Sequence, residues 1–370
     1  MELPSNWYDK VESIIINKYK HFSLKGDIDN SVLAGFLLYD SQENVLSVIS
    51  LATGTKSMSG DQRMKSSQNG PIFVHDCHAE VLAHRALQQF FWEQYDAQNK
   101  QEKSIFIENK LLSKYSIHFY TSTPPCGDCC IHIISDKITV ETGAKPFTCD
   151  QSQLSTSPPN VVRGKPGRGS KSQSVSCSDK ICIWANVGIV GSFLSQFIDQ
   201  IHLSSIIIGN GNYDSCVRSI FSRVQSKLDI NCPIICKISQ WKQKNDNPSS
   251  SSFFWWSSNL HNGEQIAPKY GRKFGVIEKK QYEKRFFSSI CDAIFFDIFK
   301  DHMKQKLNSL NDKTDIIKIN IDELSFGESK ELCKEYQSQK KIIKEKLLLY
   351  GEPWAQKFTD EKKWKSIQFS

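Results

Sequence analysis

Predicted strands and helices alternate along the chain, and this order limits the possible folds more than any other feature of the sequence. The elements predicted from apolar spacing are strands over 32–39, 45–51, 117–120 and 205–208, and helices over 79–94, directly after Cys126 and over 179–197. The first two strands flank a polar turn at 40–44, so we expect them to form a hairpin. The alternation of the two element types predicts an α/β fold.

The remaining segments extend this pattern at both ends of the chain. They are a helix over 7–20, a polar loop over 53–69, a loop rich in Ser, Pro, Gly and Lys over 150–174, a low-complexity stretch over 242–252, an aromatic strand over 253–256, and helical patterns over 279–306 and 329–349. No internal repeat is visible. Because a single core stops growing near roughly 250 to 300 residues, a chain of 370 residues can form one large domain or two small ones. Of these two, we expect one elaborated domain.

Charge and cysteine content restrict the location and the partners. A formal net charge of +7 suggests a polyanionic partner, and lysines and arginines concentrate at 163–171 and 269–346. The twelve cysteines are too scattered for a disulfide framework, which indicates a reducing compartment. No secretory signal and no apolar run long enough to cross a bilayer are present. We expect an intracellular protein, in the nucleus or the cytoplasm, without a membrane partner.

Two short motifs carry the residue types of a catalytic metal site. His78 and Glu80 lie at the start of a predicted helix, and Cys126 follows two prolines at the end of a predicted strand. A catalytic zinc takes His and thiolate ligands and keeps one position open for water, while a carboxylate beside the metal moves the proton of that water. Together, the two motifs match the H-x-E and P-C signature of zinc deaminases. A two-residue offset separates side chains on a regular helix, so His78 and Glu80 converge only at its first turn.

Two cysteines compete for the third metal position. Cys129 completes a C-x-x-C spacing with Cys126, whereas Cys177 begins another predicted helix, where the positive end of the dipole favours a thiolate. If both bound together with His78, the site would have four protein ligands and no open position, as structural zinc sites do. The spacing alone leaves both alternatives open.

Six strings make the chain resemble the adenosine deaminases that act on RNA. They are ATGTK (52–56), HDCHAE (75–80), STPPCGD (122–128), TGAK (142–145), RGKPGRG (163–169) and SCSDK (176–180). Within this series, TGAK followed by the KPGRG loop is most similar to the eukaryotic members that act on transfer RNA, which convert the adenosine on the 3′ side of the alanine anticodon, position 37, to inosine. The resemblance implies a cytidine-deaminase-like three-layer core, with a mixed sheet between helices, over about 31–225. It also implies a helical carboxyl-terminal extension over about 226–370, within one domain.

The same resemblance implies roles for the motif residues. His78, Cys126 and Cys177 correspond to the zinc ligands, and Glu80 corresponds to the proton-transferring carboxylate of a hydrolytic deamination at adenine C6. The position of Cys129 is commonly a small residue in the family, so this chain departs there. Asp76 and Lys165 correspond to residues that support the metal ligands, although Asp76 also suits a helix cap.

Members of this family bury inositol hexakisphosphate, a ligand that needs many basic and polar donors. The positions that match its contacts are Arg85, Lys180, Trp184, Ser192, Lys330, Tyr336, Lys340, Trp354 and Lys357. Three positions depart from the family, because His75, Ile183 and Phe326 replace polar residues. From periodicity alone, the 329–349 segment also fits an amphipathic helix whose lysines face water.

Fewer residues indicate how the RNA substrate would bind. Thr55 and Lys56 match family positions that contact the nucleotide and its phosphate, and Arg168 lies in the Gly-rich loop near the expected position of the flipped base. About thirty residues precede the similar region, too few for a double-stranded-RNA-binding module, which favours tRNA. We expect no obligate protein partner. The alternatives are editing of messenger or double-stranded RNA, and a catalytically silent, zinc-containing RNA-binding protein.

Overall fold

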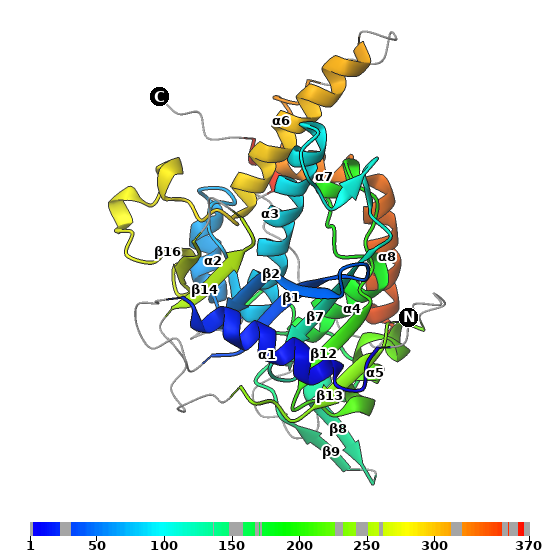
Figure 1. The fold of residues 1–370 in the computed structure, drawn as a ribbon. Helices are drawn as coiled ribbons and strands as arrows, with labels where there is room; N and C mark the ends of the chain where they lie inside the picture. The colour runs from blue at the N-terminus through cyan, green and yellow to red at the C-terminus, as the bar shows by residue number, and fades with distance from the viewer. Residues whose placement is uncertain are drawn as a thin grey trace.

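A mixed sheet lies at the centre of the molecule (Figure 1). The structure is a computed structural model that describes residues 3–22, 31–135, 137–147, 158–166, 170, 172–225, 232–241, 251–258, 262–311, 320–349, 354 and 362–365. In spatial order the eight strands are β13 (Ile234–Lys237), β12 (Ser205–Gly209), β7 (Tyr115–Thr121), β1 (Leu33–Asp40), β2 (Val45–Thr53), β14 (Ser252–Trp256), β15 (Glu264–Ala267) and β16 (Arg272–Lys273). β12 pairs in parallel with β7 and β13, and the other pairs are antiparallel.

One face of the sheet is covered by α1 (Trp7–Lys20). The apolar residues of this helix recur three or four positions apart, and Trp7, Val11 and Ile15 are buried against the sheet. Gly35 of β1 permits the close approach, because a Cβ there would lie 2.5 Å from the Ile15 side chain and 2.5 Å from the Ser50 carbonyl oxygen. The first helix and the first hairpin are therefore as predicted.

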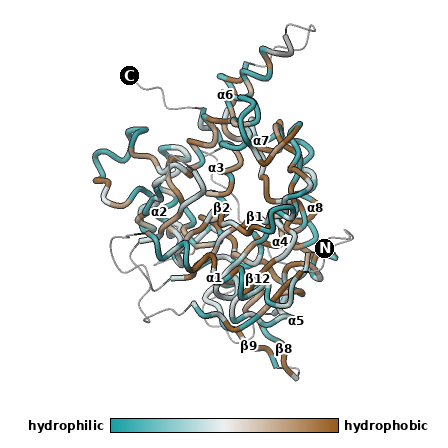
Figure 2. The backbone as a smooth tube through the Cα atoms, viewed as in Figure 1, coloured by the Kyte–Doolittle hydropathy of each residue, from teal (hydrophilic) through white to brown (hydrophobic). Residues whose placement is uncertain are grey.

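The opposite face is covered by α3 (Ala79–Asn99), α4 (Cys177–Val187) and α5 (Tyr213–Ile220), which share a second apolar core. Alternate residues of β1 separate the two cores, since Leu33 and Leu37 face α1 while Ala34 and Phe36 face α3. Hydrophobic stretches of the backbone concentrate around these central strands (Figure 2). This layered arrangement of helix, sheet and helices confirms the predicted α/β class.

The carboxyl-terminal residues complete the same body. α6 (Asp292–Asn311) packs its first half against α3, and α8 (Lys334–Leu348) lies beside α4 (Figure 1). α7 (Phe326–Glu331) packs its Phe326 against Phe193 and against Phe296 of α6. Because β14 to β16 belong to the central sheet, the later residues contribute strands as well as helices. None of the helices in the described ranges is long and apolar enough to cross a membrane.

The predicted polar loop over 53–69 is wrong. It contains β3 (Thr55–Ser57), which pairs with β4 (Asp76–His78), and α2 (Gly60–Ser67), whose amino terminus is capped by the Ser59 hydroxyl. The strand pairing joins segments that are far apart in sequence, and the helix is short and mostly polar. Local apolar spacing therefore carries no signal for either element.

Four helix predictions had wrong bounds, and the helix predicted over 79–94 continues to Asn99. The 179–197 segment ends at Val187 because Gly188 adopts a positive φ of 110°, which ends a helix. The 279–306 segment begins its helix only at Asp292, because residues 278–280 are exposed and have no core against which a helix could pack. The 329–349 segment is two helices, interrupted where Cys333 leaves helical geometry at φ −82° and ψ 54°.

Shorter elements connect the layers. They are η1 (Asp128–Cys130), η3 (Leu194–Gln196), η4 (Ser222–Val224), η5 (Glu278–Lys280), η6 (Lys284–Phe286), β5 (Phe106–Ile107), β6 (Lys110–Leu111), β8 (Ile131–Ile134), β9 (Lys137–Val140), β10 (Lys145–Pro146) and β11 (Arg163–Gly164). The predicted short helix after Cys126 is thus a three-residue 3-10 turn. Residues 150–157, 167–169 and 171 of the predicted 150–174 loop, and residues 242–250, lie outside the described residues.

Glu12 anchors α1 to the sheet, and its removal tests that packing. Its buried carboxylate accepts hydrogen bonds from Tyr120 Oη (2.8 Å), Ser239 Oγ (2.6 Å) and the Gln240 backbone N–H (3.1 Å). Glu12→Ala would leave these donors unsatisfied, so we expect the free energy of unfolding to fall by about 2 to 4 kcal/mol. Urea denaturation measures the change, with the exposed Glu43→Ala as the control. Equal stability of the two variants would contradict the anchoring role.

Candidate functional site

The site begins where β4 passes into α3. His78 is the last residue of β4 and the N-cap of α3, with an extended ψ of 144°, and Glu80 lies in the first helical turn. Because His78 is not yet helical, the two-residue offset does not turn the two side chains apart. β3 fixes this junction, since Thr55 pairs with His78 and the Ala79 N–H donates to the Gly54 carbonyl over 2.9 Å.

Three potential metal ligands meet at this junction. His78 Nδ1 lies 3.8 Å from Cys126 Sγ and 3.7 Å from Cys177 Sγ, and the ligand atoms of the three residues are all within 4.8 Å of one another. Cys126 comes from the loop after β7, and Cys177 from the first turn of α4. The spacing and the mixed nitrogen and sulfur donors suit a tetrahedral zinc with one position left for water.

Glu80 is the carboxylate beside these ligands. It is buried, and its Oε2 has no hydrogen-bond partner among the described residues. Burial raises the pKa of Glu80, and the nearby Cys126 sulfur raises it further. A buried carboxylate with an unused oxygen is suited to receive and return a proton.

A buried charge network supports the cluster from behind. Lys165 Nζ donates to both oxygens of Asp76, each over 2.8 Å, and to Cys177 Sγ over 3.0 Å. Lys180 binds the same carboxylate from α4. Burial opposes ionisation of Asp76, but the two ammonium groups outweigh it and hold the pKa of this carboxyl well below its usual range. Asp76 Oδ1 also accepts from the His78 N–H, so it supports the start of α3 as well.

Cys129 lies apart from the three ligands. Its N–H donates to Ser178 Oγ over 3.1 Å, and its buried thiol interacts with that of Cys216. Among the described residues, only His78, Cys126 and Cys177 form a metal-sized cluster. The geometry therefore favours Cys177 over Cys129 in the choice that the sequence spacing leaves open.

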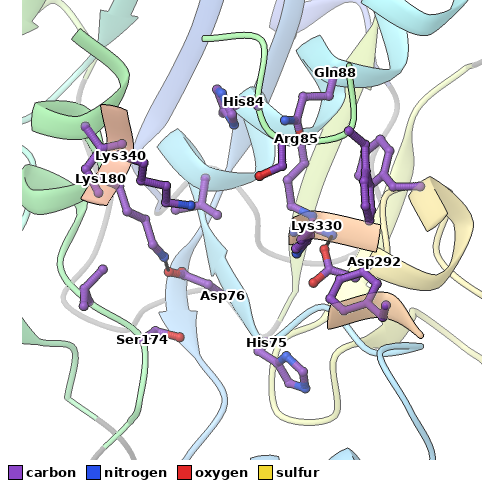
Figure 3. A pocket seen from close by; sticks show the side chains of 18 of the residues that line it. His75, Asp76, His84, Arg85, Gln88, Ser174, Lys180, Asp292, Lys330 and Lys340 are labelled. Carbon is purple, nitrogen blue, oxygen red and sulfur yellow. Dashed lines mark hydrogen bonds and ion pairs between the residues drawn. The ribbon is translucent and has the colours of Figure 1, made fainter. Parts of the chain in front are cut away.

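Asp76 and Lys180 also line a cavity of about 940 Å³ (Figure 3). Eight of the nine positions matched to inositol-phosphate contacts line it, namely Arg85, Lys180, Trp184, Ser192, Lys330, Tyr336, Lys340 and Trp354. Lys357 lies outside the described residues. The three departures, His75, Ile183 and Phe326, line the same cavity.

The cavity also has basic residues that the sequence comparison missed. Arg63, Lys344 and Lys362 line it, so seven lysines and arginines face three carboxylates, Asp76, Asp292 and Glu331. Arg85 is bound to Asp292. Lys344 had a detectable signal, because it follows Tyr336 and Lys340 at four-residue intervals on one face of α8. Such a surplus of positive charge in one cavity suits an anion with several charges.

The expected substrate residues are only partly described. Thr55 and Lys56 lie on β3 and pair with His78 and Cys77 of β4, so strand pairing holds them beside the metal cluster. Both are partly exposed. Arg168 lies outside the described residues.

Comparison with known proteins places this site in a family. Residues 50–357 match the family described as adenosine-deaminase (editase) domain, and the chain belongs to that family. Zinc is implied by the deaminase family, and the His and Cys cluster agrees with it.

Several relatives are similar over long stretches. The chain is 28% identical over 369 residues to tRNA-specific adenosine deaminase 1 of Drosophila melanogaster. This alignment covers 88% of this chain and 88% of that protein. It is 28% identical over 324 residues to the double-stranded RNA-specific editase Adar of the same species, covering 78% of this chain but 47% of that protein. tRNA-specific adenosine deaminase 1 of Saccharomyces cerevisiae is 25% identical over 236 residues, 55% of this chain and 58% of that protein. The chain thus spans about half of the editase.

Replacing Lys165 tests the support of the metal cluster. Lys165→Met keeps the length of the side chain but removes the donor to Cys177 and one of the two ammonium groups at Asp76. We expect zinc affinity to fall about 10- to 100-fold, as for other lost partners of metal ligands. Competition with a chelating dye measures it, and exposed Lys103→Met is the control. Unchanged zinc affinity in a folded Lys165→Met protein would show that this network does not support the ligands.

Proposed function

We propose that the protein deaminates adenosine to inosine in transfer RNA, at position 37 of alanine tRNA. The observation that carries this proposal is the buried Glu80 carboxylate, with its unused oxygen, beside His78, Cys126 and Cys177. The tRNA substrate is supported by the relative that matches 88% of both chains and is named tRNA-specific. An editing enzyme for messenger or double-stranded RNA is the second candidate, supported by the similarity to the editase.

His78, Cys126 and Cys177 are the residues that would hold zinc. When bound, the metal supplies the Lewis acidity that makes water nucleophilic near neutral pH. Glu80 accepts the proton of the attacking water and delivers it to the purine ring and then to the leaving amine, so that inosine and ammonia form. Asp76 and Lys165 hold Cys177 and the start of α3 in place while this occurs.

Substitution of Glu80 separates catalysis from metal binding. Glu80→Gln keeps the size of the side chain but cannot take up a proton, so we expect zinc to remain bound. Turnover should fall by about two to four orders of magnitude, the usual contribution of general acid–base catalysis. Inosine formation in an alanine tRNA transcript and the zinc content of the same preparation provide the two readouts. Comparable activity in both proteins would contradict the role of Glu80, whereas absence of inosine with the unsubstituted protein would favour a silent RNA-binding protein.

The substrate is tested with a panel of RNAs. Purified protein is incubated with unmodified transcripts of several tRNAs and with long duplex RNA, and inosines are mapped in each. We expect inosine beside the anticodon of alanine tRNA. Efficient deamination of duplexes with none in alanine tRNA would replace the tRNA proposal by the editing alternative. Thr55, Lys56 and Arg168 are the proposed contacts to the nucleotide and its phosphates.

We further propose that the cavity holds inositol hexakisphosphate. The support is its seven lysines and arginines and the match of eight lining positions to family contacts. Residues from 63 to 362 line it, so the ligand would join the carboxyl-terminal helices to the sheet of a single domain. Such a ligand and such a substrate are found in the nucleus or the cytoplasm, where we place the protein.

The polyanion is tested by a double substitution on α8. Lys340→Ala with Lys344→Ala removes two cavity cations, whereas Lys341→Ala removes an exposed lysine of the same helix. We expect inositol hexakisphosphate to be released by acid from the unsubstituted protein and from Lys341→Ala, but to be depleted in the double variant. The melting temperature should fall with it, because a ligand of the native state stabilises that state. Absence of any inositol phosphate from the unsubstituted protein would contradict the assignment.

A further inference from the structure

Residues 268–286 form a projecting segment that the active-site chemistry does not use. This basic aromatic lobe contains β16, η5 and η6, and it projects at the left of Figure 1. Four of its large side chains are exposed, Tyr270 (42%), Phe274 (43%), Ile277 (56%) and Tyr282 (45%). Scattered exposed apolar residues are common, but several aromatic rings within one short segment indicate a binding surface.

The rings of the lobe lie among positive charges. The lobe has seven lysines and arginines and two glutamates. Arg272 and Lys269 lie 4.6 and 5.0 Å from the Tyr270 ring centroid, and Arg285 lies 4.8 Å from that of Phe286. Lys279 and Lys280 are exposed and have no ion pair with a described residue. Hydrophilic and hydrophobic stretches alternate along the lobe instead of forming one apolar face (Figure 2).

The lobe is attached to the segment that leads into the metal site. The Val74 N–H donates to the Gly271 carbonyl over 2.8 Å, and the rings of Phe73 and Tyr282 pack edge to face at 6.3 Å. Gly271 has a φ of 64°, and a Cβ there would lie 2.6 Å from the Val74 carbonyl oxygen, so the attachment is close. Residues 73–74 continue into β4, which pairs with the strand that carries Lys56. An RNA that binds at Lys56 would therefore lie close to the lobe.

We propose that the lobe binds unpaired nucleotides of the RNA substrate, outside the target adenosine. Exposed rings stack on the faces of bases, which only unpaired nucleotides offer, while neighbouring lysines and arginines bind phosphates. The excess of positive charge favours RNA over an apolar protein surface. This inference rests on the proposed function, because it assigns a second contact to the same substrate. It also explains how an enzyme selects a loop, in which unpaired bases flank the target.

Binding to two RNAs tests the stacking. Fluorescence anisotropy of the full chain carrying Glu80→Gln is measured with the anticodon stem-loop of alanine tRNA and with a fully paired duplex of equal length. We expect Phe274→Ala to raise Kd for the stem-loop about tenfold, the effect of losing one stacked base. Kd for the duplex should stay unchanged. Phe274→Tyr keeps a ring and should restore binding, and Tyr213→Ala removes an exposed ring elsewhere as the matched control.

The lysines and the kinetics give independent readouts. Lys279→Ala with Lys280→Ala should weaken binding of both RNAs and reduce its dependence on salt. In the active enzyme, Phe274→Ala should raise KM with kcat nearly unchanged. An unchanged stem-loop Kd for Phe274→Ala, or an equal loss for the duplex, would overturn the stacking proposal. If the unsubstituted enzyme forms no inosine in any RNA, the proposed function fails, whereas the binding data still decide the role of the lobe.

Discussion

The carboxylate of Asp76 is the interaction on which both sites depend. It is buried between the ammonium groups of Lys165 and Lys180, which come from different segments of the chain. Removal of either partner of a buried ion pair leaves an uncompensated charge, which is far more costly than loss of a surface pair. Because Lys165 also donates to Cys177, the network fixes the position of one metal ligand. Because Asp76 and Lys180 also line the cavity, the same charges face the proposed polyanion.

If the cavity holds a polyanion, the carboxyl-terminal helices would be linked through it to a site formed by earlier residues. α8 has three buried side chains, Tyr336, Ile343 and Leu347, and two of its five lysines, Lys340 and Lys344, face the cavity. Apolar burial alone therefore gives this helix a small interface with α4. An anion bound between Lys340 and Lys180 would add a strong contact across that interface. Stability of the late helices and geometry of the metal site would then depend on the same ligand.

Sequence patterns predicted those parts of the molecule whose determinants are local. α1, β1, β2 and the aromatic strand follow apolar spacing, and the motif strings identified the residues that the structure brings together at His78 and around the cavity. β3 was missed because its pairing with β4 is a tertiary contact. Lys362 and Arg63 were missed because they come from opposite ends of the chain and meet only in the folded cavity. α4 ends early because of the conformation of Gly188, and α6 begins late because residues 278–280 are exposed. Apolar periodicity in the sequence predicts neither of these features.

The position of Glu80 restricts the kind of substrate. Its carboxylate is buried at the start of α3, so a base inside a helical stack cannot reach it, and the target must leave the stack. Unstacking costs least where the base is already unpaired, as in a loop. A surface that stacks the neighbouring unpaired bases would offset part of that cost and hold the loop open. The buried carboxylate of Glu80 requires an unstacked base, and the exposed rings of the basic aromatic lobe would lower the cost of unstacking it. Selectivity for a loop would arise from the two together.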